Sequence, residues 1–516
     1  MKTFKTAGAC IPEKNYMVDL SSRLKTIRSM VDKGQYFTIN RARQYGKTTT
    51  LTALARYLYN DYTVLSISFQ GISSEGFKDE YAFVKSFYRL IKQEKGSGLA
   101  IPTDFEQAMD KLVSANCNLD DLFGTLAVWC RESRLVLIID EVDAATNFQV
   151  FMDFLAHLRD GYLRRDTKGA PAFQSVILAG VTDVKNMKRK LRPDEESKFN
   201  SPWNIAADFN VDMSFSVSDI AGMLRDYEDD HHTEMDVDAV AQIIEDYTSG
   251  YPFLVSRICQ LLDEDQEVLW NKEGIGEIVR RILMEKNTLF DSLMGKVHDN
   301  DRLREILYRI LFAGEAISYN PDDISISDAE MFGFVQNNGG TVQVTNRIFE
   351  TRLYNFFLSQ EELNSPIYQI GADEKSQFLK NGRLDMDQVL ERYAVVFEDL
   401  YGGKDGKFDE VEGRLRFLLF VRPIINGTGH YHIEEETRDR KRMDLVIDYH
   451  ADEFVIELKI WRGQKYHEDG ERQLCGYLDS KHLDKGYMLT YSFNKEKKAG
   501  VEYKTVDGKE LMEVVV

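Results

Sequence analysis

Two apolar, β-branched segments near the carboxyl end of the chain are separated by a short turn and predict a β-hairpin. On the second segment Glu457 and Lys459 are two positions apart, so a strand places both side chains on one face of the sheet. Charged groups are rarely buried unless they are paired or bind a metal ion. With Asp444 on the neighbouring strand, two carboxylates can converge on a hard cation such as Mg²⁺. The alternative is a surface hairpin with a structural Glu–Lys pair. The two arms are residues 442–448 and 454–459, and the turn between them contains Asp452 and Glu453.

In this arrangement Asp444, Glu457 and the backbone carbonyl of Leu458 would hold the metal ion. Lys459 would orient or deprotonate the attacking water, or stabilise the charge of the transition state. The chemistry that suits this set is hydrolysis of a phosphodiester. An acid followed by Glu-x-Lys on the next strand resembles the PD-(D/E)XK nuclease superfamily, although Met443 stands where that motif has proline.

Two further segments match the same superfamily. Glu412 lies in a helical segment, residues 411–420, where many of these nucleases carry an additional acid near the metal. Gln473 and Tyr477 fit the glutamine-containing helix that follows the nuclease core. The resemblance therefore implies a complete nuclease active site. A degenerate member of the superfamily that binds without cutting would keep the same outline.

A second site is indicated near the amino end, where the strand-like residues 37–40 lead into a loop with Gly-Lys-Thr and then into a helical pattern. Such a loop holds phosphates with its backbone N–H groups and with the N-terminus of the helix. Lys47 would reach the β- and γ-phosphates, and Thr48 would bind Mg²⁺. The loop residues expected to contact the nucleotide are Arg41, Arg43, Gln44, Tyr45, Gly46, Lys47, Thr48 and Thr49.

A buried strand that ends in acids supplies the other half of this site. Residues 134–139 are almost entirely apolar and are followed by Asp140 and Glu141. Asp140 would hold Mg²⁺ through water, and Glu141 would polarise the hydrolytic water. A later core strand, residues 176–181, is followed by Thr182, a candidate sensor of the γ-phosphate. Strands that alternate with helices in this way predict a parallel α/β sheet with the nucleotide at the carboxyl ends of its strands.

Taken together, these motifs resemble bacterial AAA-ATPase-like proteins that carry a C-terminal PD-(D/E)XK domain. In that family the P-loop reads Arg-x-Arg-x-x-Gly-Lys, which residues 41–47 match. Residues 201–205 also fit, and residues 249–252 look like the Gly-x-Pro turn of STAND-type ATPases. In those ATPases the proline, here Pro252, lies near the adenine. The resemblance implies an ATPase core and a nuclease core.

The order of these patterns along the 516 residues predicts four segments. The winged-helix-like segment among them would either bind DNA or act as a rigid spacer. The predicted segments are a P-loop ATPase core of the AAA/STAND type at 1–214, a helical lid at 215–298, a winged-helix-like segment at 299–362 and a restriction-endonuclease-like α/β domain at 363–516.

Composition limits the partners and the compartment. No run of about eighteen apolar residues is present, so no membrane span is expected. Five scattered cysteines without a CxxC pair favour a reducing, cytoplasmic location. The formal charge of −20 weighs against binding of nucleic acid, because neutralisation of phosphates dominates such affinity. Net charge does not exclude such binding, because local basic clusters determine whether nucleic acid binds. One such cluster, residues 438–442, leads directly into the predicted nuclease site.

The expected function is an ATP-dependent or ATP-regulated nuclease that acts on DNA. ATP and Mg²⁺ are the expected cofactors, with Mn²⁺ as an alternative in the nuclease site. A homo-oligomer is expected, since AAA-type sites often borrow an arginine from a neighbouring subunit. The resemblance alone suggests defence or mobile-element biology. The rival interpretation is a nucleotide switch or scaffold whose nuclease-like domain binds nucleic acid or a protein partner without cutting. RNA stays open as the target.

Overall fold

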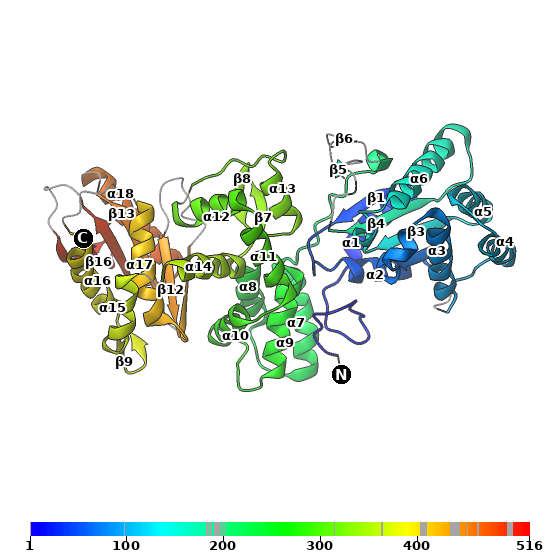
Figure 1. The fold of residues 1–516 in the computed structure, drawn as a ribbon. Coiled ribbons are helices and arrows are strands. Elements are labelled where there is room, and N and C mark those ends of the chain that lie inside the picture. Colours follow the sequence, from blue (N-terminus) through cyan, green and yellow to red (C-terminus); the bar gives the residue numbers. More distant parts are fainter. Residues whose placement is uncertain are drawn as a thin grey trace. The chain divides into compact units, whose positions relative to one another are not determined.

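The computed structural model contains two compact units (Figure 1). The first unit comprises Met1–Val237, Gly250–Gln260 and Met331–Gly333, and the second comprises Asp238–Ser249, Leu261–Glu330 and Phe334–Val516. The structure describes residues 2–96, 99–181, 184, 188–189, 198–199, 202–313, 315–362, 365–402, 410–433, 444–450, 452–461, 464–492 and 499–516.

The first unit is built on a four-stranded sheet in the order β1-β4-β3-β2, in which every neighbouring pair is parallel. All residues of β3 and β4 are buried, as expected for strands that are covered on both faces. The predicted parallel α/β sheet is therefore confirmed. Its strands are β1 (Phe37–Asn40), β2 (Thr63–Ser68), β3 (Leu135–Asp140) and β4 (Ser175–Gly180).

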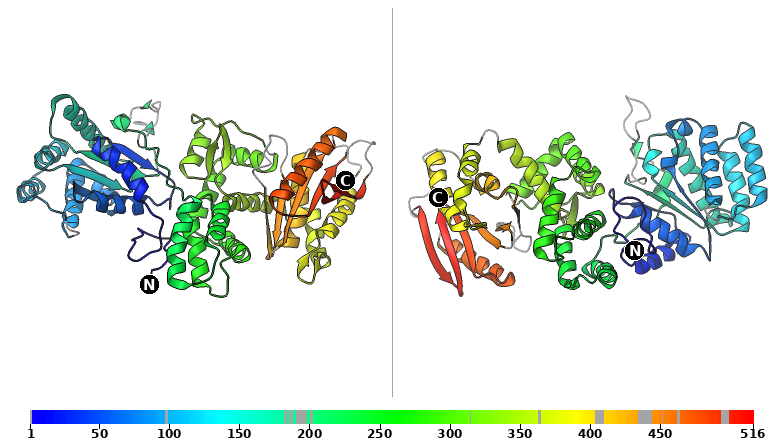
Figure 2. Two further views of the ribbon diagram at one scale, coloured as in Figure 1. Left: turned by 180° about the vertical axis from the view of Figure 1, so that it is seen from behind. Right: turned by 90° about the horizontal axis from the view of Figure 1, so that it is seen from below.

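Helices surround this sheet (Figure 2). One face packs on α3, α5 and α6 in a core that includes Leu137, Trp129 and Phe154, while α2 contacts β2 and β3. A short antiparallel pair, β5 (Lys188–Arg189) and β6 (Lys198–Phe199), follows the sheet. The helices are α1 (Ser21–Asp32), α2 (Lys47–Leu58), α3 (Glu80–Lys95), α4 (Thr103–Ser114), α5 (Leu119–Glu132), α6 (Gln149–Lys168) and α7 (Val217–His231), together with the start of α9 (Pro252–Glu264).

The second unit begins with helices and one antiparallel hairpin, formed by β7 (Val335–Asn338) and β8 (Thr341–Val344). Within the described parts of the chain, no helix combines the length and the apolar character needed to cross a membrane. The helices around this hairpin are α8 (Val237–Thr248), α10 (Lys272–Met284), α11 (Thr288–Asp299), α12 (Asp301–Ala313), α13 (Ile324–Met331) and α14 (Arg347–Glu362).

The rest of the second unit is a six-stranded mixed sheet in the order β11-β12-β13-β14-β16-β15. Helix α18 packs on one face, where Leu474 and Leu478 meet β14 at Gly486. Helix α17 packs on the other face, where its Gly413 meets Tyr491 of β14. The elements are α15 (Pro366–Glu374), β9 (Leu379–Lys380), β10 (Arg383–Leu384), α16 (Met386–Tyr401), α17 (Glu410–Ile425), β11 (Gly429–Ile433), β12 (Asp444–Tyr449), β13 (Asp452–Ile460), α18 (Gln464–Ser480), β14 (Lys485–Tyr491), β15 (Gly500–Val506) and β16 (Lys509–Val515).

The predicted hairpin is present as the antiparallel pair β12 and β13, but the prediction that Asp452 and Glu453 lie in its turn is wrong. Asp452 and Glu453 belong to β13, where they pair with Tyr449 and Asp448 of β12. The chain reverses directly after Tyr449, where His450 adopts a left-handed conformation with φ of 55°. Strand β13 therefore extends further toward its amino end than the apolar pattern indicated.

Candidate functional site

The predicted P-loop connects β1 to α2 at the carboxyl edge of the parallel sheet. Gln44 and Gly46 have positive φ values of 57° and 78°, which fold the loop back so that α2 begins at Lys47. The Lys47 side chain is buried, and its Nζ donates hydrogen bonds to the backbone carbonyls of Arg41 and Ala42, at 2.9 and 2.8 Å. Burial lowers the pKa of Lys47. The ammonium group thus points into the cradle that the loop forms.

The predicted magnesium ligands are in direct contact at the same edge. The hydroxyl of Thr48 donates to Asp140 Oδ2 at 2.7 Å, and the backbone N–H of Glu141 donates to Asp140 Oδ1 at 2.9 Å. Glu141 has a φ of 55°, and its pKa is raised, first by burial and then by the charge of Asp140. A hydroxyl and a carboxylate in contact with each other are oxygen ligands that suit Mg²⁺. A bound Mg²⁺ would stabilise the negative charge of the phosphates.

An aromatic pair connects the P-loop to the start of α9. The rings of Tyr45 and Tyr251 meet edge to face at 4.9 Å, and the Tyr251 hydroxyl donates to the backbone carbonyl of Arg43 at 2.7 Å. Pro252 is the next residue and begins α9. The structure therefore brings the predicted Pro252 turn to the P-loop. Tyr251 was missed, because no local pattern shows a hydroxyl bonding across 208 residues.

Other predicted nucleotide contacts have structural partners. The Arg41 guanidinium donates to the carbonyl of Val211 at 2.8 Å and lies over the Phe209 ring at 5.4 Å. Thr49 Oγ1 accepts a hydrogen bond from the backbone N–H of Cys10 at 3.1 Å. These contacts fix the P-loop against its surroundings. Thr182 lies outside the described residues.

The predicted nuclease pair is buried on β13. Only 1% of Glu457 and 2% of Lys459 is exposed, and Lys459 Nζ lies 3.2 Å from Glu457 Oε1. Asp444 is the backbone register partner of Glu457 on β12. The side chain of Asp444 and the whole basic cluster 438–442 lie outside the described residues. The surface-hairpin alternative for the pair is wrong, since both charges are buried.

Helix α18 closes over this pair. A Cβ atom built on Gly470 would lie 1.1 Å from Lys459 Nζ, so the helix backbone borders the ammonium directly. Gln473 follows one turn later on the same helix and is half-buried. On α17, Glu412 accepts a hydrogen bond from Arg416 at 2.7 Å. Sequence reasoning missed Gly470, because a glycine inside a helix carries no signal of what lies against it.

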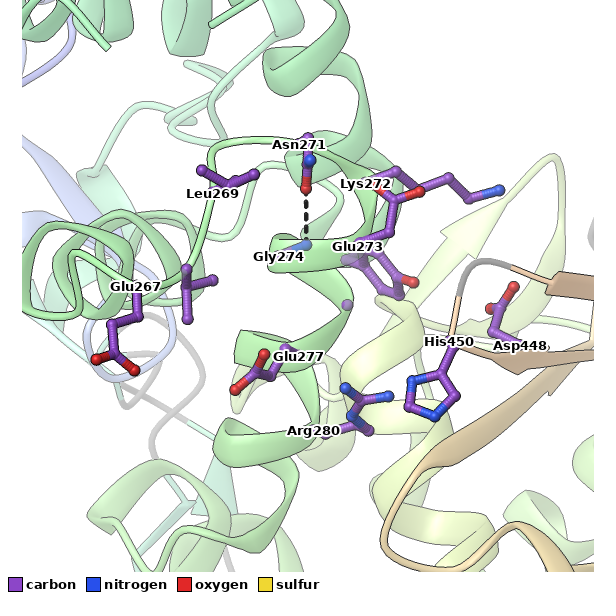
Figure 3. A pocket seen from close by; sticks show the side chains of 13 residues that line it. Glu267, Leu269, Asn271, Lys272, Glu273, Gly274, Glu277, Arg280, Asp448 and His450 are labelled. Atoms are coloured by element: carbon purple, nitrogen blue, oxygen red, sulfur yellow. Dashed lines mark hydrogen bonds between the residues drawn. The ribbon is translucent and has the colours of Figure 1, made fainter. Parts of the chain in front are cut away.

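The opposite end of the hairpin borders a pocket of about 310 Å³ in the second unit (Figure 3). Lys272, the first residue of α10, forms an ion pair with Glu453 of β13 at 2.6 Å. Arg280 on the same helix donates to the backbone carbonyl of Thr428. Helix α10 is thus fixed to the sheet that carries Glu457 and Lys459. The pocket is lined by Tyr247, Glu267, Val268, Leu269, Asn271, Lys272, Glu273, Gly274, Gly276, Glu277, Arg280, Asp448 and His450.

A family model described as AAA-like domain matches residues 13–359, which is more than half of the chain. The chain belongs to the AAA-like domain family. This match includes the P-loop, the acids that follow β3 and the start of α9, and the parallel sheet is that of a P-loop ATPase. It confirms the AAA-like part of the predicted resemblance. The match does not reach residues 360–516.

Three solved structures resemble the AAA-like chain at a distance. The Walker-type ATPase PABY2304 of Pyrococcus abyssi has 12% identity and a TM-score of 0.47, covering 68% of this chain and 99% of its own. The RuvB Holliday junction branch migration motor of Thermotoga maritima has 12% identity and a TM-score of 0.32, with 63% and 91% covered. The ORC2 protein of Aeropyrum pernix, solved as ADPNP–ADP complexes, has 11% identity and a TM-score of 0.38, with 66% and 93% covered. No curated protein matches the chain.

Proposed function

We propose that this AAA-like protein is an ATP-regulated, metal-dependent nuclease that hydrolyses DNA phosphodiester bonds. The observation that supports it most is the buried pair of Glu457 and Lys459 on one face of β13, with Asp444 opposite in register. Burying two charges costs several kcal/mol per ion, and the attraction within the pair can fail to offset that cost, so a purely structural role is a poor reason for such a pair. Asp444, Glu457 and the Leu458 carbonyl would hold the metal, and Lys459 would act on the attacking water.

On this proposal ATP occupies the P-loop of the first unit. The phosphates would take over the Lys47 ammonium from the two loop carbonyls that now accept its hydrogen bonds. Thr48 and Asp140 would hold Mg²⁺ next to them, and Glu141 would accept the proton of the attacking water. Residues 1–214 would form the ATPase core, 215–298 the lid, 299–362 the winged-helix-like segment and 363–516 the nuclease domain. A homo-oligomer would complete the ATP site with an arginine from a neighbouring subunit.

The test is cleavage of plasmid DNA by the purified full chain with Mg²⁺ or Mn²⁺, with and without ATP. Glu457→Gln and Lys459→Met should abolish cleavage and leave ATP hydrolysis unchanged, because both side chains belong to the second unit. Glu510→Gln is the matched control, since this acid lies in the same sheet but is exposed. Cleavage that persists in both pair variants would refute the proposed site. The same assay with RNA decides between the two nucleic acids.

One observation favours the rival function of a nucleotide switch that binds without cutting. Lys459 already neutralises Glu457 at 3.2 Å, so the pair has a cation without any metal ion. The formal charge of −20 also weighs against tight binding of DNA. Intact DNA and RNA under every metal and nucleotide condition, together with retained ATP hydrolysis, would favour this switch.

A further inference from the structure

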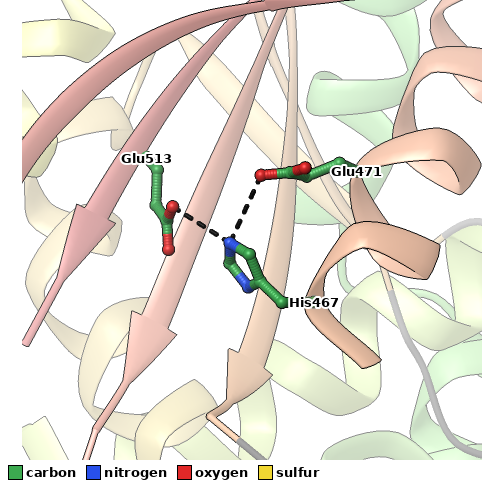
Figure 4. Close-up of side chains that lie close together, drawn as sticks. All are labelled: His467, Glu471 and Glu513. Carbon is green, nitrogen blue, oxygen red and sulfur yellow. Dashed lines mark hydrogen bonds and ion pairs between the residues drawn. The ribbon is translucent and has the colours of Figure 1, made fainter. Parts of the chain in front are cut away.

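A second buried polar network lies beside the Glu457–Lys459 pair and joins α18 to the sheet (Figure 4). Its centre is the Glu513 carboxylate of β16, of which 2% is exposed. The Thr490 hydroxyl of β14 donates to Glu513 Oε1 at 3.0 Å, and Lys504 Nζ of β15 donates to Oε2 at 2.8 Å. The buried His467 of α18 contacts the same Oε2 through Nε2 at 3.0 Å. Four elements thus meet at one carboxylate.

The network contains its own cation. Lys504 Nζ also donates to Glu471 Oε1 at 2.8 Å, so one ammonium bridges two carboxylates. His467 Nε2 lies 3.4 Å from Glu471 and 3.0 Å from Glu513, and these three side chains alone would be spaced for a metal ion. Burial by itself lowers the pKa of Lys504, but its hydrogen bonds to Glu471 and Glu513 raise that pKa overall. The Lys504 ammonium therefore occupies the position between the two carboxylates that a metal ion would otherwise take.

The network borders the nuclease pair through two elements. Thr490 is the register partner of Lys459 on the neighbouring parallel strand. On α18, His467 comes three residues before Gly470, whose backbone closes over the Lys459 ammonium. A helical turn that is fixed at His467 is also fixed at Gly470, because one turn spans 3.6 residues. Any movement of this turn changes the space that Lys459 occupies.

We propose that Lys504, Glu513 and His467 are positioning residues that hold α18 over the Glu457–Lys459 pair. Lys504 acts as an internal cation that binds the helix, through Glu471, to the sheet, through Glu513. This inference rests on the proposed nuclease function for its catalytic readout. Its structural readout, the stability of α18 against the sheet, does not depend on cleavage.

The experiment replaces the internal cation in the full chain with Lys504→Met and restores it with Lys504→Arg. Lys504→Met should lower kcat for DNA cleavage by about 10-fold or more and leave KM for DNA within about 2-fold, because a small misplacement of a catalytic group acts on kcat. Hydrogen exchange in the first two turns of α18 should become faster. Lys504→Arg should recover both. Lys485→Met is the matched control, since this β14 lysine pairs with Asp387 of α16 and with Glu510 and not with α18.

The double variant Lys504→Met with Glu471→Gln removes one carboxylate together with the ammonium, and it should show the same losses if the single variant does not fold. Unchanged kcat and unchanged exchange of α18 in Lys504→Met would overturn the proposal. Stoichiometric binding of Zn²⁺ or Mn²⁺ would also overturn it, if Glu513→Gln abolishes that binding and Lys504→Met strengthens it. The cluster would then be a metal site. If the unmodified protein cuts neither DNA nor RNA, the nuclease proposal fails, and the exchange comparison still decides whether the network holds α18.

Discussion

At the scale of single residues, Lys47 has two loop carbonyls as partners that the phosphates of ATP would replace. Lys47→Met should lower kcat/KM for ATP hydrolysis by about 100-fold or more, because a preorganised donor to the transition state is lost. Phosphate release measured against ATP concentration checks this. Lys25→Met, which changes an exposed lysine of α1, should hydrolyse ATP normally. Equal activity in the two variants would remove Lys47 from the site.

The raised pKa of Glu141 gives the ATP site a pH dependence. Burial is its largest cause and the charge of Asp140 the second, and both favour the protonated acid. A general base must be deprotonated, so kcat/KM for ATP should fall as the pH is lowered through this raised pKa. The pH profile of kcat/KM reports the pKa values of the free protein, before ATP binds. Glu141→Gln should lower the rate by about 100-fold or more above this pKa and should remove the acid limb of the profile. An acid limb at the ordinary pKa of glutamate would contradict the assignment.

At the scale of elements, α18 offers two glycines that differ only in what lies against them. A Cβ at Gly470 would collide with Lys459 Nζ, whereas nothing lies within 4 Å of a Cβ at Gly476. Gly470→Ala should therefore displace the lysine or the helix and lower DNA cleavage by about 100-fold, as a misplacement of about 1 Å can do. Gly476→Ala should cut normally and gain up to about 1 kcal/mol in unfolding free energy. Cleavage rates and thermal melts of both variants check this, and equal cleavage would argue against contact between α18 and Lys459.

The elements that sequence could predict are those whose signal is local. Strand β3 can be predicted from an apolar run that ends in acids, and β12 and β13 can be predicted from their apolar arms and Glu-x-Lys. Each of these signals lies within about ten residues. The network around Glu513 could not be predicted. His467 and Glu513 are 46 residues apart, and each is an ordinary polar residue in its own segment. The turn was predicted too long because the charged residues at the start of β13 look like a loop until Lys272 is seen to pair with Glu453.

At the scale of the whole molecule, the second unit contains both α10 and the six-stranded sheet that carries Glu457 and Lys459. Glu453, which pairs with Lys272 of α10, lies on β13 four residues before Glu457. Side chains two and four positions apart share a face of a strand, so Glu453 and the Glu457–Lys459 pair lie on the same side of β13. Helix α8 lies in the same unit, and the chain continues from it through Gly250 to Tyr251, which contacts the P-loop. Tyr247 of α8 lines the same pocket as Asp448 of β12, so contacts within the second unit connect this helix to the six-stranded sheet.

This arrangement predicts that Lys272→Ala weakens the control of cleavage by ATP. Lys272 is half-exposed, so the loss of the pair should change the unfolding free energy by less than about 1 kcal/mol. ATP hydrolysis should stay within about 2-fold of normal, while the ratio of DNA cleavage with ATP to cleavage without it should fall toward one. Lys286→Ala, at an exposed lysine beyond the end of α10, should keep the normal ratio. Lys481 also contacts Glu453, at 3.4 Å, so the double variant with Lys481→Ala should show the larger loss of control. An unchanged ratio in the double variant would mean that ATP acts on the nuclease by a route other than α10 and β13.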